Sequence, residues 1–146
     1  MIIREAVPAD RDALLEIWLR SVRATHKFLT EDDIQSLLPL VRDAALVELE
    51  LWVLCSRSGA PVGFLGLAEA KVEALFIAPE WIRRGGGRLL IEHARQLRGA
   101  LTVDVNEQNP DALSFYRACG FEVVARSAVD DAGRPFPLLH LREVSP

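Results

Sequence analysis

The chain has 146 residues, half of them hydrophobic, which suffices for the core of one domain spanning residues 1–146. Seventeen basic and 21 acidic residues leave a formal net charge of −4. This mildly acidic balance argues against a general nucleic-acid-binding protein.

Cysteine usage and hydropathy narrow the class of protein further. Cys55 and Cys119 lie far apart and belong to no spacing typical of metal ligands, so we expect a reduced protein with no bound metal. We find no signal peptide and no apolar run long enough to cross a bilayer. We therefore expect a cytoplasmic protein that does not bind membranes.

Hydrophobic periodicity and turn residues predict the order β-α-α-β-β-β-α-β-α-β-β. In chain order the elements are a strand at 2–6, helices at 11–22 and 30–38, strands at 46–57, 61–70 and 71–79, a helix at 86–97, a strand at 101–107, a helix at 110–119, and strands at 121–129 and 135–144. Short strands that alternate with helices in the second half predict an α/β fold, in which helices flank a mixed sheet.

Two helices carry clear end signals. Thr30 and Asp33 resemble a capping box, with Asp in place of the usual Glu. Asn109 and Pro110 suit the N-cap and the first position of the last helix, and Gly120 suits its left-handed C-cap. We also expect an Arg88/Glu92 pair on the preceding helix, at i,i+4.

The stretch IRRGGGRLL at residues 82–90 lies between a predicted strand and a predicted helix. The first N–H groups of a helix lack intrahelical partners and favour an anion, and glycine lets an oxygen approach the backbone. Arginine side chains add charge-assisted hydrogen bonds. The predicted phosphate cradle comprises Arg83, Arg84, Gly85, Gly86, Gly87 and Arg88.

Other interpretations of the three glycines are a flexible turn with solvated arginines, a P-loop and a dinucleotide-binding turn. A P-loop would need a Lys-Ser/Thr pair after the last glycine, which this chain does not have. A dinucleotide-binding turn would need G-x-G-x-x-G after the first strand, whereas this turn is incomplete and lies mid-chain. The phosphate cradle and the flexible turn remain.

The segment VNEQNPDALSFYRACGF, residues 105–121, decides between them. It resembles the signature after the fifth strand of the GNAT superfamily of N-acetyltransferases, at the positions Asn109, Ala112, Tyr116, Gly120 and Phe121. The stretch LFIAPEWIRRGGGRLL resembles the coenzyme A motif of that family. The order of elements agrees over nearly the whole chain, and SVRATHKFL, VNEQN and RSAVDDAGRPFPLLHL resemble the bacterial YjaB-type acetyltransferases.

The resemblance implies acetyl transfer from acetyl-CoA to a primary amine of a small molecule or a protein, by direct attack. It implies that Tyr116, the single tyrosine, protonates the departing thiolate, and a phenol with a pKa near ~10 suits that step. It also implies that the backbone of Phe76 and Ile77 binds the cofactor as an added strand, and that Asn109 contacts it. Asn109 has an alternative role as a helix cap alone.

The general base is less well defined by the sequence. Glu73, on the strand that leads to the glycines, is our first candidate, while Glu69 and His26 are alternatives. His93 and His140 have no obvious constellation around them. The resemblance places the acceptor pocket in the segment after the first helix, with Thr25, His26, Phe28 and Leu29 as its lining.

One departure from the family pattern motivates a competing function. The turn usually begins with Arg or Gln, whereas Ile82 occupies that position here. A coenzyme A-binding module or sensor that has lost acetyl transfer is therefore the alternative, although the retained Tyr116 argues against it. Homodimers are common in general, and we note one as an option that no sequence feature marks.

Overall fold

The computed structural model describes residues 1–144 and contains one seven-stranded sheet in the order β1-β2-β3-β4-β5-β7-β6. Every neighbouring pair is antiparallel except β4 and β5, which are parallel. The strands are β1 (Ile2–Glu5), β2 (Glu50–Cys55), β3 (Pro61–Ala68), β4 (Lys71–Ile77), β5 (Thr102–Asn106), β6 (Phe121–Ser127) and β7 (Leu138–Glu143). The α/β fold with a mostly antiparallel sheet is thus confirmed.

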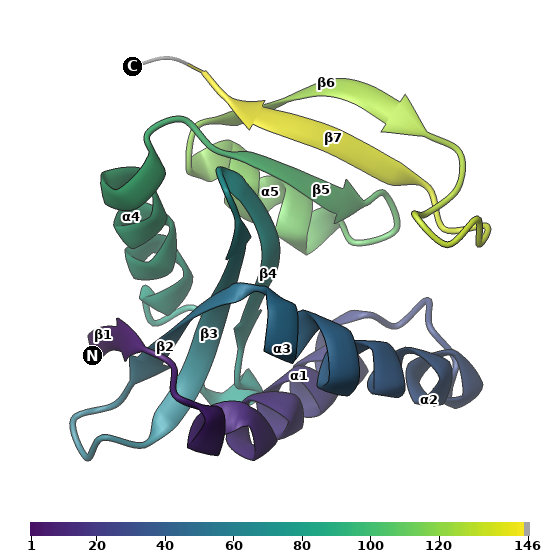
Figure 1. The fold of residues 1–146 in the computed structure, drawn as a ribbon. Coiled ribbons are helices and arrows are strands. Elements are labelled where there is room, and N and C mark those ends of the chain that lie inside the picture. The colour runs from purple at the N-terminus through teal and green to yellow at the C-terminus, as the bar shows by residue number, and fades with distance from the viewer. Residues whose placement is uncertain (145–146) are drawn as a thin grey trace.

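Helices cover both faces of this sheet (Figure 1). They are α1 (Arg11–Thr25), α2 (Glu31–Leu40), α3 (Leu46–Glu48), α4 (Gly86–Arg98) and α5 (Pro110–Ala118). Two 3-10 turns, η1 (Pro8–Asp10) and η3 (Pro79–Trp81), and the π-helical turn η2 (Val41–Ala45) complete the order.

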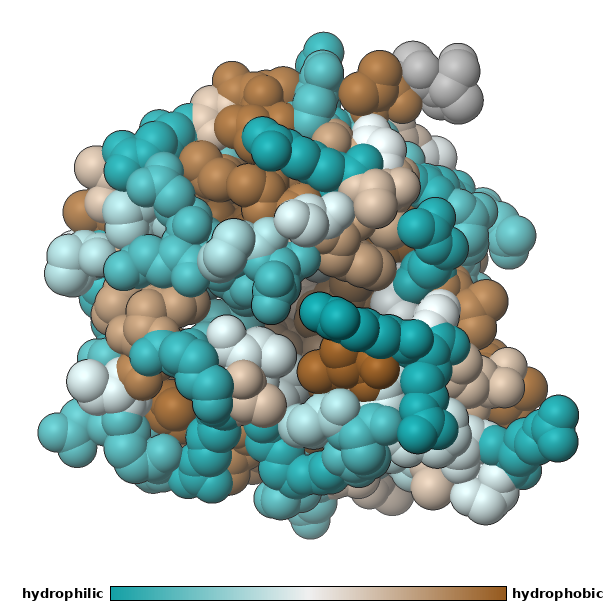
Figure 2. Space-filling model, turned by 180° about the vertical axis from the view of Figure 1, so that it is seen from behind, coloured by the Kyte–Doolittle hydropathy of each residue, from teal (hydrophilic) through white to brown (hydrophobic). Residues whose placement is uncertain are grey.

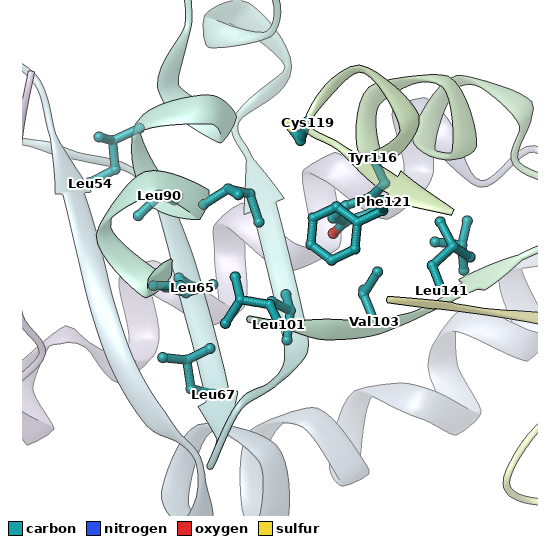
Figure 3. Packing of buried hydrophobic residues seen from close by; sticks show 14 of the residues in the cluster. Leu54, Leu65, Leu67, Leu90, Leu101, Val103, Tyr116, Cys119, Phe121 and Leu141 are labelled. Atoms are coloured by element: carbon teal, nitrogen blue, oxygen red, sulfur yellow. The ribbon is translucent and has the colours of Figure 1, made fainter. Parts of the chain in front are cut away.

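Two hydrophobic clusters lie on opposite faces of the sheet. On one face α1, α2 and α3 pack on the sheet through a cluster that includes Leu14, Ile17, Trp18, Val53 and Phe64. On the other, α4 and α5 pack through Leu90, Val103, Tyr116, Phe121 and Leu141, which Figure 3 shows from close by. Burial of this apolar area is the main driving force for assembling the layers.

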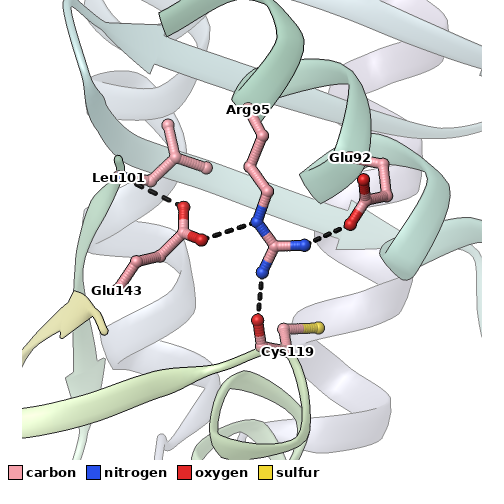
Figure 4. Close-up of polar contacts among 5 residues, drawn as sticks. All are labelled: Glu92, Arg95, Leu101, Cys119 and Glu143. Carbon is pink, nitrogen blue, oxygen red and sulfur yellow. Dashed lines mark hydrogen bonds and ion pairs between the residues drawn. The ribbon is translucent and has the colours of Figure 1, made fainter. Parts of the chain in front are cut away.

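Arg95 joins α4 to the last strand and to the end of α5 (Figure 4). Its Nε donates to the Glu143 carboxylate at 2.6 Å, and the other Glu143 oxygen accepts the N–H of Leu101 at 3.0 Å. Its remaining nitrogens donate to Glu92 and to the carbonyl of Cys119. The predicted Arg88/Glu92 pair is therefore wrong, because Glu92 turns toward Arg95 one turn later.

The predicted helix ends at Thr30 and Gly120 are confirmed. Thr30 Oγ1 accepts the N–H of Asp33, whose carboxylate accepts the N–H of Thr30 in return. Gly120 has a left-handed φ of +96° after α5.

The strand predicted at 46–57 is wrong at its beginning. Residues Leu46–Glu48 are helical, and β2 starts at Glu50. Leu46 and Leu49 recur at a spacing of three, so one helical turn directs both toward the first cluster and its cavity. The apparent alternation in LVELEL matched that spacing as well as it matched a strand.

Within residues 1–144, no helix is both long and apolar enough to span a membrane, and no group of His, Cys, Asp and Glu side chains is arranged to hold a metal ion. Both cysteines are buried and free. On the face opposite to that of Figure 1, apolar side chains reach the surface in separate groups with polar ones between them (Figure 2).

Candidate functional site

The candidate site lies where β4 and β5 part. These strands pair only at their first residues, Lys71 with Thr102 and Val72 with Val103. Beyond that point β5 turns away with β7 and β6, as Figure 1 shows, so the second half of β4 has a strand neighbour on the β3 side alone. An unpaired strand edge of this kind can accept an extended ligand as an added strand.

Phe76 and Ile77, predicted to bind the cofactor through their backbone, lie on this free part of β4. Phe76 pairs with Phe64 and Ile77 with Gly63 on the β3 side. Both side chains are partly buried, one toward each hydrophobic cluster. Both residues lie beyond the pairing of β4 with β5, and their backbone contact with the cofactor stays a prediction.

The glycine turn follows the same strand after the short turn η3, and α4 begins at Gly86. Leu89 is the first helix residue whose N–H reaches a carbonyl, that of Gly85 at 3.1 Å. The N–H groups of Gly86, Gly87 and Arg88 have no acceptor among the described residues, and the N-cap has no side-chain hydrogen bond. This helix end therefore presents partial positive charge beside the β4–β5 opening.

The structure also explains why each of these three positions is occupied by glycine. Gly85 has a left-handed φ of +86°. A Cβ at Gly86 would lie 2.5 Å from Leu54 Cδ2, and one at Gly87 would lie 3.0 Å from Phe115 Cζ. The flexible-turn interpretation fails for the last two, because both are tightly packed.

The three arginines of the turn are exposed, and none of them forms an ion pair with a described residue. Arg84 lies over the ring of Trp81 at 4.9 Å from its centroid, and Arg83 has a φ of +66°. Unneutralised cations at a helix N-terminus add to its attraction for an anion.

Asn109 is buried and acts as the N-cap of α5. Its Oδ1 accepts the N–H of Ala112 at 3.2 Å, so this oxygen already has a partner within the protein. The capping role is established by this bond, and a contact to a cofactor stays a prediction.

Tyr116 reaches from α5 into the buried cluster beside Phe121 (Figure 3). Its ring meets Phe115 and Phe121 edge-on, at centroid distances of 5.1 and 5.4 Å. Burial, with a smaller contribution from Cys119, raises the pKa of this phenol well above its usual value. The phenol of Tyr116 therefore stays protonated at neutral pH, and its role as proton donor stays a prediction.

Glu73 lies at an irregularity of β4. Gly66 pairs with Ala74 and Leu67 with Val72, so Glu73 is the extra residue of a bulge. The Glu73 carboxylate is 3.2 Å from Lys71 Nζ, and the residue lines an apolar cavity of about 140 Å³ together with Trp18, Phe64 and Phe76. Glu69, by contrast, is exposed in the turn before β4, at the end of that strand which still pairs with β5.

His140 is part of a constellation, contrary to the sequence expectation. Its Nδ1 lies 2.6 Å from Asp104 Oδ1 and its Nε2 lies 2.6 Å from Ser127 Oγ, while Asp104 Oδ2 is 2.9 Å from Lys71 Nζ. Register across β5 and β7 brings Asp104 and His140 side by side, and their separation of 36 residues left no local signal. His93, the other histidine without an expected role, stacks edge-on with Trp52 at 4.3 Å.

The four residues predicted to line the acceptor pocket lie at the end of α1 and in the loop before α2. The ring of His26 is 5.5 Å from that of Phe28 and 6.4 Å from that of Phe76 on β4. Phe28 in turn lies 5.9 Å from Phe136, in the loop between β6 and β7. Aromatic contacts thus join these two loops to each other and to β4, and the sequence did not suggest that Phe136 takes part.

The hydrogen bonds of His26 define its tautomer. The Thr25 hydroxyl donates to the carbonyl of Ser21 at 2.8 Å, so His26 Nδ1, 2.9 Å from that hydroxyl, is the donor of the second bond. Nε2 is left as an acceptor, and burial lowers the pKa of the ring. Leu29 packs against the first hydrophobic cluster.

Comparison with known proteins is consistent with this arrangement. The acetyltransferase (GNAT) domain family matches residues 48–123. Peptidyl-lysine N-acetyltransferase YjaB of Escherichia coli is 45% identical over 142 residues, which cover 97% of this chain and 96% of that protein. The solution structure of apo YjaB superimposes with a TM-score of 0.92, at 44% identity and full coverage of both chains.

Two further proteins extend the comparison. Peptidyl-lysine N-acetyltransferase YiaC of Escherichia coli is 35% identical over 135 residues, 92% of each chain. The PaiA N-acetyltransferase of Thermoplasma acidophilum, solved in complex with coenzyme A, shares the fold with a TM-score of 0.80 at 19% identity and 97% coverage of both chains. On the strength of the family match and the YjaB identity, the chain belongs to the GNAT acetyltransferases.

Proposed function

We propose that this enzyme transfers the acetyl group of acetyl-CoA to the ε-amine of a lysine in a protein. One observation carries the proposal. The free edge of β4 and the unpaired N–H groups at the start of α4 lie next to each other. An extended ligand that ends in phosphates needs both features, at adjacent positions. YjaB and YiaC, both peptidyl-lysine N-acetyltransferases, support the choice of acceptor.

The residues present fit acetyl-CoA. The N–H groups of Gly86, Gly87 and Arg88 bind its pyrophosphate, and the free edge of β4 at Phe76 and Ile77 binds the pantetheine. The departure at Ile82 removes one side-chain contact but leaves the backbone donors, and three unpaired arginines compensate for it. When bound, acetyl-CoA supplies an activated acetyl thioester.

Acetyl transfer then needs three contributions from the protein. Glu73 accepts a proton from the incoming ammonium group, directly or through water, because only the neutral amine has a lone pair for attack. Backbone N–H groups at the bulge and along β4 stabilise the charge that develops on the carbonyl oxygen. Tyr116 donates its proton to the departing sulfur, and its raised pKa keeps that proton in place beforehand.

The acceptor enters from the side of the aromatic residues His26, Phe28 and Phe136. These rings and the apolar cavity beside Glu73 suit the methylene chain of a lysine, with the charged end directed to the carboxylate. Such a side chain buries its stem on apolar surface while its ammonium reaches a counter-charge.

The test is thiol release from acetyl-CoA in the presence of unstructured peptides that each carry one lysine. The matched control peptide replaces that lysine by norleucine, and it has no other free amine. We expect release with lysine peptides and none with the control, together with a loss of about 100-fold in kcat for Tyr116→Phe and Glu73→Gln. Isothermal titration of acetyl-CoA runs in parallel for each variant.

Two results would contradict the proposal. Tight acetyl-CoA binding without thiol release for any amine would favour the alternative function of a coenzyme A-binding module. Unchanged turnover in Glu73→Gln would move the role of base to His26, whose Nε2 is free to accept a proton.

A further inference from the structure

A chain of polar contacts crosses four strands beside the β4–β5 opening. Glu73 contacts Lys71 at 3.2 Å, Lys71 contacts Asp104 at 2.9 Å, and Asp104 contacts His140 at 2.6 Å. His140 ends the chain at Ser127 Oγ, also at 2.6 Å. The contacts therefore run from β4 through β5 and β7 to β6.

Lys71 lies between two carboxylates in this series of polar contacts. It belongs to the first of the two residue pairs that join β4 to β5, and its ammonium group links a carboxylate on each strand. Burial disfavours its charge, but the hydrogen bonds to Asp104 and Glu73 outweigh this and raise the pKa of Lys71. The ammonium is thus a fixed cation beside the base.

We propose, on the basis of the acetyl transfer above, that Lys71 is a positioning residue which Asp104 and His140 hold beside Glu73, where its charge orients the base and disfavours a second ammonium. An acceptor lysine that reaches Glu73 comes close to the Lys71 ammonium. A like charge at that distance lowers the pKa of the acceptor amine, which is otherwise near ~10.4, and so favours its neutral form. The N–H bond of the acceptor breaks, and an O–H bond forms on Glu73.

Asp104 and His140 give Lys71 this fixed position. Both ring nitrogens of His140 have partners, so the ring cannot rotate without losing one of them. Asp104 accepts from both sides, and although burial opposes its charge, the bonds to His140 and Lys71 lower its pKa. A protonated Lys71 also has no lone pair, and so it does not compete with the acceptor for the acetyl group.

The titratable groups that face Lys71 come from three strands. Glu73 lies on its own strand, Asp104 lies on β5, and His140 lies on β7 behind Asp104. The nearest charged residues in sequence and register are exposed: Glu69 in the turn before β4, and Arg142, the partner of Thr102. The carboxylates of Glu73 and Asp104 therefore dominate the surroundings of the ammonium.

The first test uses the fact that Lys27 and Lys71 are the only lysines of the chain. Lys27 is exposed, and its one hydrogen bond within residues 1–144 goes to the carbonyl of Arg23, at 3.1 Å, so it is an internal reference. The protein is treated with a limiting amount of acetic anhydride at neutral pH, and both sites are quantified by mass spectrometry. This readout requires no acceptor and no turnover.

We expect Lys71 to react about 10-fold more slowly than Lys27, because its neutral form is rarer. In Asp104→Asn the rate at Lys71 rises toward that of Lys27, and His140→Gln, as a second variant, shifts it the same way. Equal rates in the wild type would overturn the proposal, because Lys71 would then not be held in its charged form. A slow rate that Asp104→Asn leaves unchanged would also overturn it, because simple burial would explain that result.

The second test measures kcat against pH with a single-lysine peptide that the wild type acetylates. Lys71→Met should lower kcat about 10-fold and move its rise with pH upward by about one unit, with the KM for acetyl-CoA little changed. Lys71→Arg keeps the charge and should restore the wild-type profile. Arg98→Met, which removes an exposed ion pair with Glu50, is the matched control.

Three outcomes would contradict this role. The first is a wild-type pH profile in Lys71→Met, and the second is a Lys71→Arg variant that is as impaired as Lys71→Met. Acetyl-CoA cleavage without acceptor that disappears in Ser127→Ala would instead assign the histidine to activation of the Ser127 hydroxyl. If the wild type acetylates no peptide at all, the proposed function fails, while the anhydride result still decides the state of Lys71.

Discussion

The α-carbon of Gly87 lies against the ring of Phe115, so that a Cβ added there would be 3.0 Å from Cζ and 3.1 Å from Cε1. Phe115 in turn contacts Tyr116 edge-on at 5.1 Å. The turn that is proposed to bind phosphate and the proposed proton donor are therefore connected through a single phenylalanine ring.

This contact predicts that a smaller residue at position 115 compensates for an alanine at position 87. Gly87→Ala should displace Phe115, with a cost of about 1–3 kcal/mol in the free energy of unfolding and a lower kcat. Phe115→Leu should relieve the clash, so the double variant should be less impaired than the sum of the single effects. Urea unfolding and steady-state kinetics measure both. Gly85→Ala is the control: it has open space around it, so Phe115→Leu should not rescue it.

Tyr116 is the only tyrosine, so its ionisation can be followed by the near-ultraviolet absorbance of the phenolate. Burial raises its pKa in the folded state, whereas the unfolded chain loses this proton near pH ~10. Stability is therefore fully present below that pH and is lost as the pH rises further. We expect no phenolate signal near pH ~10 until the protein unfolds, and greater alkaline stability in Tyr116→Phe. A normal titration in the native state would contradict this.

Asp10 has a lowered pKa, in contrast to Tyr116, and so affects stability at low pH. Both its oxygens accept from Arg4, at 2.8 and 2.9 Å, and one also accepts the N–H of Val7 at 2.8 Å. The Arg4 hydrogen bond, against an opposing effect of burial, lowers the pKa of Asp10 to about 2. This stabilisation is present above the unfolded pKa near ~4 and is lost as the pH falls through the folded value.

Asp10→Asn should accordingly destabilise the protein by about 1–3 kcal/mol at neutral pH. The difference from the wild type should shrink as the pH falls from about 4 toward 2. Thermal unfolding across this range measures it. Asp43→Asn, which disrupts only an exposed pair with Arg42, should change stability by less than about 0.5 kcal/mol.

The arginines of the turn should contribute to acetyl-CoA affinity through charge. We expect Arg83→Gln combined with Arg88→Gln to raise the dissociation constant about 10-fold, and the wild-type affinity to weaken with added salt more steeply than that of the variant. Calorimetry at two ionic strengths tests this. Arg57→Gln, an exposed residue in the turn between β2 and β3, is the control. Equal salt dependence in variant and wild type would show that the backbone alone holds the anion.

The sequence by itself determined the features that depend on neighbours along the chain. Thr30 and Asp33 cap one helix, and Asn109, Pro110 and Gly120 delimit another, because each signal needs only the few residues around it. The order of elements and the family followed from such segments. Where a local pattern fitted two periods, as at residues 46–49, the prediction from sequence was wrong.

Only the tertiary structure decided how the site is assembled. The bulge at Glu73, the opening between β4 and β5, and the approach of Phe136 to Phe28 depend on the register of strands distant in the chain. The contact of Asp104 with His140 spans 36 residues and follows from one pairing of β5 with β7. A shift of one residue would turn those side chains to the opposite face, and no spacing in the sequence records that choice.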